Sequence, residues 1–331
     1  MYPETIDLIG NTPLVKLKKA SEQTGCTILG KAEFMNPGGS VKDRAALYII
    51  KDAIKKGQIQ KGGVVVEGTA GNTGIGLAVV ANAMGFKTHI VMPNTQAEEK
   101  KAAILSLGAE LQLVPPAKYA SDEHFTKISK RVADELNVKE TGGAVWANQF
   151  DNVANREAHT QTTAPEIWQQ TDGTIDAFVS TVGSGGTLAG TGIGLKQKNK
   201  DIIVALADPY GASLYNFYAH GELKSEGNSI AEGIGQGRIT ANLEDAPIDD
   251  QFMVDDEAGL EVIYSLIKDE GLSLGLSSGI NIAGAVRLAK KLGPGKTIVT
   301  MLCDSGFRYQ SRLFNREFLL SKGLTPPNWL K

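Results

Sequence analysis

Short apolar segments alternate with helix-length segments along almost the whole chain. Residues 64–67 are a short, largely apolar run that suits a strand buried in a parallel sheet. Further strands are predicted at 14–17, 27–34, 88–92, 110–114, 177–181, 202–207, 252–254 and 297–302. Repeated strand–helix units of this length predict an α/β fold with mostly parallel sheets.

The segments between the strands predict the helices and the domain count. Helices are predicted at 41–56, 97–107, 124–136, 157–170, 258–269 and 282–292, with two more opening after the loops at 68–74 and 183–187. The stretch 208–251 predicts loops with short helices, and 271–279 predicts a loop. A length of 331 residues exceeds what one core usually holds, so two domains are expected. No disordered linker separates them, which predicts close packing.

The overall composition excludes several classes of protein. A formal net charge of −3 argues against nucleic acid as a main partner. No run approaches the ~20 apolar residues that span a membrane, and the N-terminal residues lack the pattern of a signal peptide. Cys26 and Cys303 lie far apart, which argues against a disulfide scaffold. These features predict a cytoplasmic protein.

One lysine stands at the start of a predicted helix, directly behind a turn built from Pro37, Gly38 and Gly39. Glycine permits sharp turns, and Ser40 is a good N-cap for the helix. Lys42 would lie near the helix N-terminus, where the macrodipole disfavours a cation and lowers its proton affinity. Such a lysine suits a nucleophile or a Schiff base. A solvent-exposed helix lysine is the alternative.

Residues 183–187, with the sequence Gly-Ser-Gly-Gly-Thr, follow a predicted strand and open a helix. Backbone N–H groups and hydroxyls at a helix N-terminus form a phosphate cradle. The dinucleotide pattern requires glycine where this chain has Leu188, and the lysine of a P-loop is missing. The loop therefore suits a single phosphate monoester. Glycines for close packing between strand and helix are the alternative.

A second loop, residues 69–73, follows another predicted strand. It combines the side chain of Asn72 with two threonine hydroxyls and exposed amides. These groups can hold a carboxylate by hydrogen bonds alone. A capped helix start is the alternative.

Residues 275–279 match the G-x-S-x-G elbow of serine hydrolases. That fold needs a catalytic histidine after the serine, but all four histidines precede it, and the segment before the elbow is a poor strand. The serine hydrolase interpretation is therefore rejected. The histidines also lack the spacing of metal ligands, so no metal site is predicted. Only His159, on a predicted helix, is worth following; the others are His89, His124 and His220.

An activated lysine, a monophosphate cradle, a carboxylate-binding loop and a pair of loop hydroxyls suit one cofactor. Pyridoxal 5'-phosphate forms a Schiff base with lysine, its phosphate needs a cradle, and its ring nitrogen needs a partner. We therefore predict a pyridoxal-phosphate enzyme.

Longer motifs support this prediction. The opening segment 8–15, the segment NPGGSVKDR at 36–44, GTAGNTG at 68–74, and Asn148-Gln149-Phe150 with the residues up to 168 appear in this order. GSGGT at 183–187 and the serines at 277–278 follow. Together they resemble the cysteine synthase (O-acetylserine sulfhydrylase) and cystathionine β-synthase family of fold type II pyridoxal-phosphate enzymes. The resemblance covers nearly the whole chain.

The resemblance implies an architecture and a set of site residues. It implies two Rossmann-like domains of the tryptophan synthase β-like kind, a large cofactor domain of 1–42 plus 148–331 and a smaller mobile substrate domain of 43–147. Lys42 would carry the cofactor and later serve as the base. Asn72 would contact the ring hydroxyl and Ser277 the ring nitrogen. The phosphate would be held by Gly183, Ser184, Gly185, Gly186 and Thr187, and the substrate carboxylate by Thr69, Ala70, Gly71, Asn72, Thr73 and Gln149.

The reaction implied is β-replacement on O-acetyl-L-serine by sulfide, giving L-cysteine and acetate. A neutral Ser277 would not keep the pyridine protonated, which favours β-elimination and replacement. The resemblance also implies a homodimer and a serine acetyltransferase partner.

Several positions depart from the family pattern and leave the substrate pair open. Ala70 stands where the family usually has serine, and Cys303 and Asp304 replace a usual Pro-Ser. Glu232 stands where cysteine synthases often carry glutamine and cystathionine β-synthases can carry glutamate. O-phosphoserine is an alternative donor, with Arg238 as its anchor, and homocysteine is an alternative nucleophile.

Two further alternatives concern the reaction itself. Serine and threonine dehydratases share the fold, but their asparagine loop ends in Asn-His rather than Asn72-Thr73. A regulatory protein that keeps the cofactor without the activity is the other alternative, with Ala70 and Asp304 as marks of lost activity.

Overall fold

The computed structural model describes residues 2–69 and 71–331. Its larger sheet has six strands in the order β1-β2-β10-β7-β8-β9. Only β1 runs antiparallel to its neighbour, and the other pairs are parallel. The strands are β1 (Leu14–Lys16), β2 (Thr27–Ala32), β7 (Ala177–Ser180), β8 (Ile203–Pro209), β9 (Asp250–Val254) and β10 (Thr297–Leu302).

The smaller sheet has four parallel strands in the order β5-β4-β3-β6. They are β3 (Val64–Gly68), β4 (Lys87–Pro93), β5 (Glu110–Val114) and β6 (Ala144–Trp146). Every residue of β3 is buried, as expected for a central strand covered on both faces. The α/β prediction with mostly parallel sheets is confirmed.

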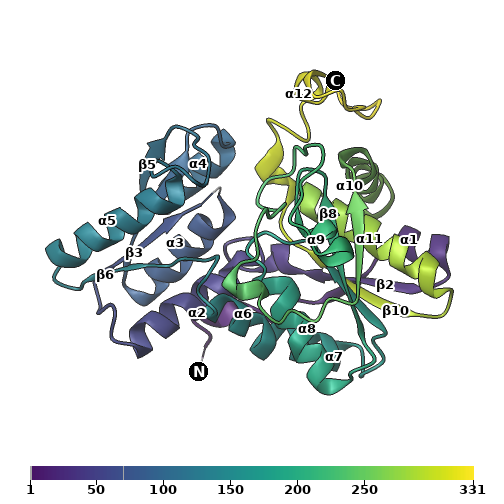
Figure 1. Ribbon diagram of the computed structural model, residues 1–331, viewed down its shortest axis with the longest axis horizontal. Coiled ribbons are helices and arrows are strands. Elements are labelled where there is room, and N and C mark those ends of the chain that lie inside the picture. Colours follow the sequence, from purple (N-terminus) through teal and green to yellow (C-terminus); the bar gives the residue numbers. More distant parts are fainter. Residues whose placement is uncertain (1, 70) are drawn as a thin grey trace.

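Each sheet is covered by helices and forms one lobe of the molecule, with α3, α4 and α5 around the smaller sheet (Figure 1). The helices are α1 (Lys18–Thr24), α2 (Lys42–Lys55), α3 (Asn72–Met84), α4 (Glu98–Ser106), α5 (Phe125–Lys139), α6 (Ala154–Ala158), α7 (Ala164–Gln170), α8 (Gly186–Lys198), α9 (Leu214–His220), α10 (Asp256–Glu270), α11 (Leu276–Leu292) and α12 (Arg316–Ser321). A π-helical turn, His159–Thr163, joins α6 to α7, and short 3-10 turns lie at Thr5–Leu8, Glu33–Met35, Ala241–Leu243 and Gly306–Tyr309.

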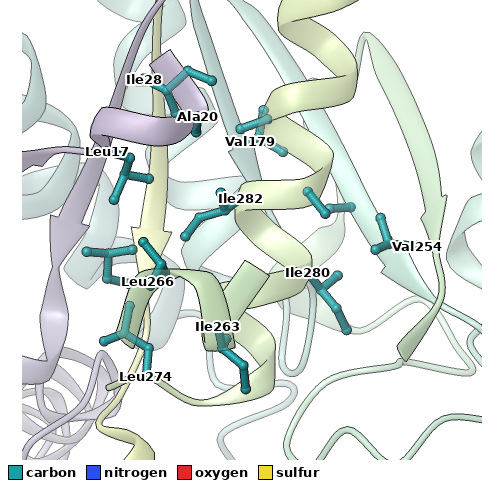
Figure 2. Close-up of a cluster of buried hydrophobic side chains, with 14 of the residues drawn as sticks. Leu17, Ala20, Ile28, Val179, Val254, Ile263, Leu266, Leu274, Ile280 and Ile282 are labelled. Atoms are coloured by element: carbon teal, nitrogen blue, oxygen red, sulfur yellow. The ribbon is translucent and has the colours of Figure 1, made fainter. Parts of the chain in front are cut away.

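Helix α11 lies in the main core of the larger lobe. Ile280 and Ile282 belong to one buried cluster with Val179 of β7 and Val254 of β9 (Figure 2). Burying a side chain of this size contributes roughly 1.5–3 kcal/mol. This packing holds the start of α11 firmly against the ends of the strands.

Two local predictions are wrong. Helix α11 begins at Leu276 and not at 282, so Ser277 lies in its first turn and not in a loop. The N-cap of α2 is Val41 and not Ser40, whose Oγ accepts a hydrogen bond from the Lys42 N–H at 3.3 Å. The domain division into 1–42 plus 148–331 and 43–147 stays a prediction.

Within the described residues, no helix is long and apolar enough to cross a lipid bilayer. No cluster of three histidine, cysteine, aspartate or glutamate side chains that could hold a metal ion occurs in the same residues.

Candidate active site

A cavity of about 420 Å³ lies where the carboxyl ends of strands from both sheets meet. Such an edge is the usual ligand-binding place in parallel α/β folds. The cavity brings together most of the residues expected from the sequence: Lys42, Thr69, Gly71, Asn72, Thr73, Gln149, Gly183, Ser184, Gly185, Thr187 and Ser277. Gly186 lies just behind, as the first residue of α8. Ala70 lies outside the described residues.

Lys42 is the first residue of α2 and is partly buried. The turn before it is joined to the end of β10, because the Val41 N–H donates to the Cys303 carbonyl at 2.9 Å. Ser40 forms an isolated β-bridge with Asp304. The lysine is therefore placed by the backbone of a neighbouring strand end and not by its own helix alone.

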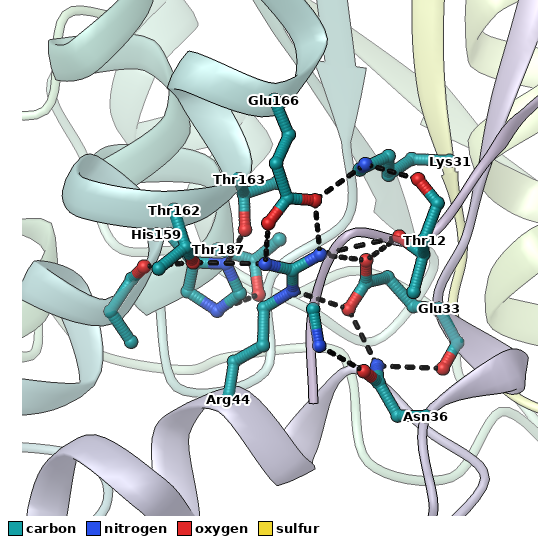
Figure 3. Close-up of polar contacts among 12 residues, drawn as sticks. Thr12, Lys31, Glu33, Asn36, Arg44, His159, Thr162, Thr163, Glu166 and Thr187 are labelled. Atoms are coloured by element: carbon teal, nitrogen blue, oxygen red, sulfur yellow. Dashed lines mark hydrogen bonds and ion pairs between the residues drawn. The ribbon is translucent and has the colours of Figure 1, made fainter. Parts of the chain in front are cut away.

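A buried ionic network lies behind the lysine turn (Figure 3). Arg44 donates to both carboxylate oxygens of Glu33 at 2.7 Å and to those of Glu166 at 2.6 and 2.8 Å. Lys31 completes the network with a 2.6 Å ion pair to Glu166. Burial alone would raise the pKa of Glu33, but the charge and hydrogen bonds of Arg44 outweigh it and lower this pKa to about 2.

This network was not predicted from the sequence, although Arg44 belongs to the lysine motif. Its four charged residues come from β2, the turn after it, α2 and α7. Their mutual contacts depend on the fold, and a charged residue in a sequence gives no sign that it is buried. The network ties the helix that carries Lys42 to the larger lobe.

The loop 183–187 has the geometry of an anion site. It leads into α8, whose N-terminus has no side-chain cap, so its first N–H groups are free to bind a ligand. The Ser184 hydroxyl accepts a hydrogen bond from Asn155 at 2.8 Å, and Thr240 donates to the Ser184 carbonyl at 2.8 Å. A Cβ on Gly183 would lie 2.2 Å from the Gly233 carbonyl oxygen. The alternative role of glycine in close packing therefore also applies here.

His159 stands behind this loop in the π-helical turn. Its Nε2 lies 3.2 Å from the Thr187 hydroxyl, and its Nδ1 lies 2.8 Å from that of Thr163. Burial, together with the nearby charge of Arg44, lowers the pKa of His159 to about 3. A neutral imidazole therefore contacts Thr187. His159 is a support of the loop and not a metal ligand.

The loop 69–73 is connected to Gln149. The Thr73 hydroxyl donates to Gln149 Oε1 at 2.6 Å, and Gln149 Nε2 donates to Glu67 Oε1 at 3.2 Å. Glu67 is 1% exposed, and burial raises its pKa to about 8, against the lowering effect of the bonds from Gln149. A neutral carboxyl group behind the loop favours the binding of an anion. The role of Glu67 was missed because it lies 82 residues from Gln149 in the chain.

The far end of the cavity is lined by Ser277 and Cys303. Burial raises the pKa of the Cys303 thiol to about 11, so it is protonated and not a nucleophile. The Cys303 N–H donates to the Ser278 hydroxyl at 2.9 Å. Next to it, Asp304 Oδ2 accepts from Asn72 Nδ2 and from the Tyr309 hydroxyl, each at 2.6 Å.

Charged side chains also join the two lobes at the cavity wall. Lys100 of α4 forms an ion pair with Glu232, and Arg312 lies 3.0 Å from the second oxygen of the same carboxylate. The Lys100 ammonium lies 4.5 Å from the centre of the Tyr309 ring. Arg238 is bound by Asp151 through two hydrogen bonds of 2.9 and 2.7 Å.

The lysine at a helix start, the uncapped helix N-terminus and the surrounding hydroxyls fit a phosphorylated aldehyde cofactor. The family described as pyridoxal-phosphate dependent enzyme matches residues 5–304. The chain therefore belongs to the pyridoxal-phosphate dependent enzymes, and pyridoxal phosphate is its cofactor.

Individual relatives narrow this class. The chain is 51% identical over 321 residues to cysteine synthase 1 of Neurospora crassa, covering 96% of this chain and 84% of the relative. It is 50% identical to cysteine synthase 1 of Emericella nidulans, covering 96% of this chain and 86% of that protein. Within the pyridoxal-phosphate dependent enzymes, the chain thus belongs to the group of the cysteine synthases.

Solved structures agree with this fold. A structure of O-ureido-L-serine synthase matches with a TM-score of 0.84 and 34% identity, over 95% of each chain. An O-acetylserine dependent cystathionine beta-synthase from Helicobacter pylori matches with a TM-score of 0.83 and 33% identity, over 94% of this chain and 98% of that one.

Proposed function

We propose that the enzyme transfers sulfide to O-acetyl-L-serine and releases L-cysteine and acetate. The observation that carries this proposal is the single cavity lined by Lys42, the loop 69–73 and the loop 183–187. The relatives named cysteine synthase support it at 51% and 50% identity. In this reaction the bond from the substrate β-carbon to the ester oxygen breaks, and a carbon–sulfur bond replaces it.

The cofactor would be held at four points. Lys42 is assigned its covalent attachment, Ser277 its ring nitrogen and Asn72 its ring oxygen. The phosphate is assigned to Gly183, Ser184, Gly185, Gly186 and Thr187. When bound, pyridoxal phosphate supplies an aldehyde that condenses with amines and a ring that withdraws electrons from the substrate α-carbon.

The substrate carboxylate would be held by the loop residues Thr69, Ala70, Gly71, Asn72 and Thr73 and by Gln149. Ala70 is included because of its place in the loop motif. The uncharged Glu67 behind Gln149 supports an anion at this place. With its amine free, Lys42 would take the proton from the substrate α-carbon as a general base. Movement of the smaller domain, residues 43–147, over the carboxylate would exclude water at this stage.

The contacts of Arg238 favour an acetyl donor over a phosphoryl donor. Its guanidinium is already bound by both oxygens of Asp151, and Lys100 on the cavity wall is likewise paired with Glu232. A phosphate on the substrate would have to displace Asp151 from Arg238 or Glu232 from Lys100. O-acetyl-L-serine requires neither displacement.

A second candidate nucleophile is homocysteine. Lys100 and Glu232 form an ion pair on the cavity wall, and opening this pair would offer a cation and an anion to the carboxylate and ammonium groups of an amino acid. The solved relative from Helicobacter pylori, named as a cystathionine beta-synthase, supports this candidate. It would form cystathionine with the same donor.

The test is to mix the holoenzyme separately with O-acetylserine, O-phosphoserine and serine and record the cofactor absorption. We expect a rapid spectral change and release of acetate with O-acetylserine alone. Sulfide and homocysteine are then compared as nucleophiles by measuring cysteine and cystathionine. A response to O-phosphoserine alone would overturn the proposed donor. No turnover with any donor would point to the regulatory alternative.

The proposal extends to partners and location. A homodimer, a complex with serine acetyltransferase and a cytoplasmic location follow from the family resemblance. Light scattering of the purified protein, alone and with a serine acetyltransferase, tests the first two. One relative, 42% identical, is named a putative mitochondrial cysteine synthase of Saccharomyces cerevisiae. Microscopy of a tagged form of this protein in cells tests the cytoplasmic location.

A further inference from the structure

The side chain of Asn72 is held at both ends by charged residues near the C-terminus. Its Nδ2 donates to Asp304 Oδ2 at 2.6 Å, and its Oδ1 accepts from Arg308 Nη1 at 2.7 Å. Arg308 also donates to the Gly38 carbonyl in the lysine turn. One pair of residues therefore connects Asn72 to the segment that carries Lys42.

The charges of these partners determine which way the amide faces. A carboxylate only accepts hydrogen bonds and a guanidinium only donates them. Turning the Asn72 amide over would set its N–H groups against Arg308 and its oxygen against Asp304. Both hydrogen bonds would be lost together, so the observed orientation is the only one that satisfies both partners.

The Asp304 carboxylate is itself fixed. It is 1% exposed, and Oδ2 also accepts from the Tyr309 hydroxyl at 2.6 Å. Its other oxygen has no hydrogen-bond partner among the described residues and lies over Gly275, where a Cβ would approach it to 2.2 Å. Only glycine at 275 permits this position. A shorter side chain at 304, such as serine, would not reach Asn72 in the same way.

The contact joins the two lobes across the cavity. Asn72 begins α3, which covers the smaller sheet, whereas Asp304 and Arg308 follow β10 of the larger sheet. The Asp304 carboxylate uses one of the two N–H groups of Nδ2, which leaves the other N–H for the cavity that Asn72 lines.

We propose that Asp304 and Arg308 are positioning residues that turn the Asn72 amide so that its remaining N–H donates to the ring oxygen of the cofactor. The inference rests on the proposed placement of Asn72 against that oxygen. A donor at this place stabilises the anionic ring oxygen. The form of the bound cofactor that absorbs in the visible range is then favoured over the form that absorbs in the near ultraviolet.

The test is the absorption spectrum of the purified holoenzymes at fixed pH, with no substrate present. Asn72→Ala should lower the ratio of the visible to the near-ultraviolet form by about tenfold, the effect of one lost hydrogen bond to a charged group. Asp304→Ser should also lower the ratio of the visible to the near-ultraviolet form. The double variant Asn72→Ala/Asp304→Ser should match Asn72→Ala alone, because Asp304 acts only through Asn72.

A matched control is Asp208→Ser. Asp208 is also fully buried, but it accepts from the Tyr215 N–H at the start of α9 and does not line the cavity. Its loss should lower the unfolding temperature and leave the spectrum unchanged. If Asp304→Ser does not fold, Arg308→Lys tests the other end of the amide, because lysine keeps the charge but not the fork that reaches both Asn72 and Gly38.

The outcomes separate the inference from its basis. A normal spectrum for Asp304→Ser and Arg308→Lys beside an altered one for Asn72→Ala would overturn the positioning role. A further loss in the double variant would also overturn it, because Asp304 would then act by another route. An unchanged spectrum for Asn72→Ala would refute the placement of Asn72 and the inference with it. Turnover with O-acetylserine and sulfide tests the proposed function independently of these spectra.

Discussion

The two loops that line the cavity are held in different ways. The phosphate loop, 183–187, accepts hydrogen bonds from Asn155 and Thr240 and packs closely against the backbone at Gly233, all from the larger lobe. The carboxylate loop, 69–73, is anchored to its own sheet by the Thr69 N–H, which donates to the Val91 carbonyl of β4 at 3.0 Å, and two of its side chains make further bonds. Thr73 bonds to Gln149, and Asn72 bonds to Asp304. The loop proposed for the cofactor is thus fixed within one lobe, whereas the loop proposed for the substrate also has a contact across the cavity, from Asn72 to Asp304.

This difference suits the chemistry proposed for each loop. A cofactor stays through every turnover, so its site gains from rigidity. A substrate must enter and leave, and contacts made by a few side chains can break and form again without unfolding a lobe. Four predictions test the difference, starting with the residue that both loops face.

Lys42→Ala should have the largest effect. Without the lysine the cofactor has no covalent attachment and the α-carbon proton has no base, so activity should fall by about 10³-fold or more. The visible cofactor band should disappear at the same time. Borohydride treatment followed by peptide mapping checks the attachment, and a trapped adduct on another lysine would show that the assignment is wrong.

Arg44→Met should cost about 3–5 kcal/mol of unfolding free energy, because it leaves the buried charges of Glu33 and Glu166 without their partner. Urea unfolding of the purified protein measures this loss. Asp134→Ala is the control, since it breaks an exposed ion pair with Lys130 on α5 and should cost at most about 0.5 kcal/mol. Equal losses in the two variants would mean that the network does not support the lysine helix.

Gly183→Ala should lower the unfolding free energy by about 1–3 kcal/mol, because the added Cβ would collide with the Gly233 carbonyl. The displacement of the phosphate loop by this collision should also weaken cofactor retention during dialysis. Gly237→Ala is the matched control, since a Cβ there meets nothing within 4 Å, and its unfolding temperature should stay unchanged. If Gly183→Ala behaved in the same way, the phosphate loop would be less rigid than the contacts indicate.

The sequence predicted most strands because they are short apolar runs bounded by loop residues, but it missed the three-residue β6 (Ala144–Trp146). It failed at the start of α11, where Gly-Leu-Ser-Ser-Gly is typical of a loop. Packing overrides that preference, since the first turns of this helix are buried against α10 and the sheet. The short helices α1 and α12 lack enough apolar periodicity to be predicted, and for α9 the sequence predicted only that short helices occur within 208–251.

The residues that line the site were predictable because they occur in compact motifs, as with Lys42 and Asn72. Their supports were not. Asp304 and Arg308 lie 232 and 236 positions from Asn72 in the chain, and no local pattern links residues so far apart. The local signals in a sequence contain no information on which buried charges meet, because that depends on how the two lobes pack.

Glu67→Gln should have the smallest effect, on the pH dependence of stability. Its pKa in the folded protein, about 8, is above the ordinary value of 4.5. Between these values the folded state holds a proton that the unfolded state has lost, so stability falls as pH rises, by up to about 1.4 kcal/mol per pH unit. Glutamine cannot ionise and removes this contribution. Urea unfolding of both proteins at about pH 6 and about pH 7 should therefore show a steeper fall for the wild type. Parallel slopes would mean that Glu67 is ionised behind the carboxylate loop, and the loop would then need another source of affinity for an anion.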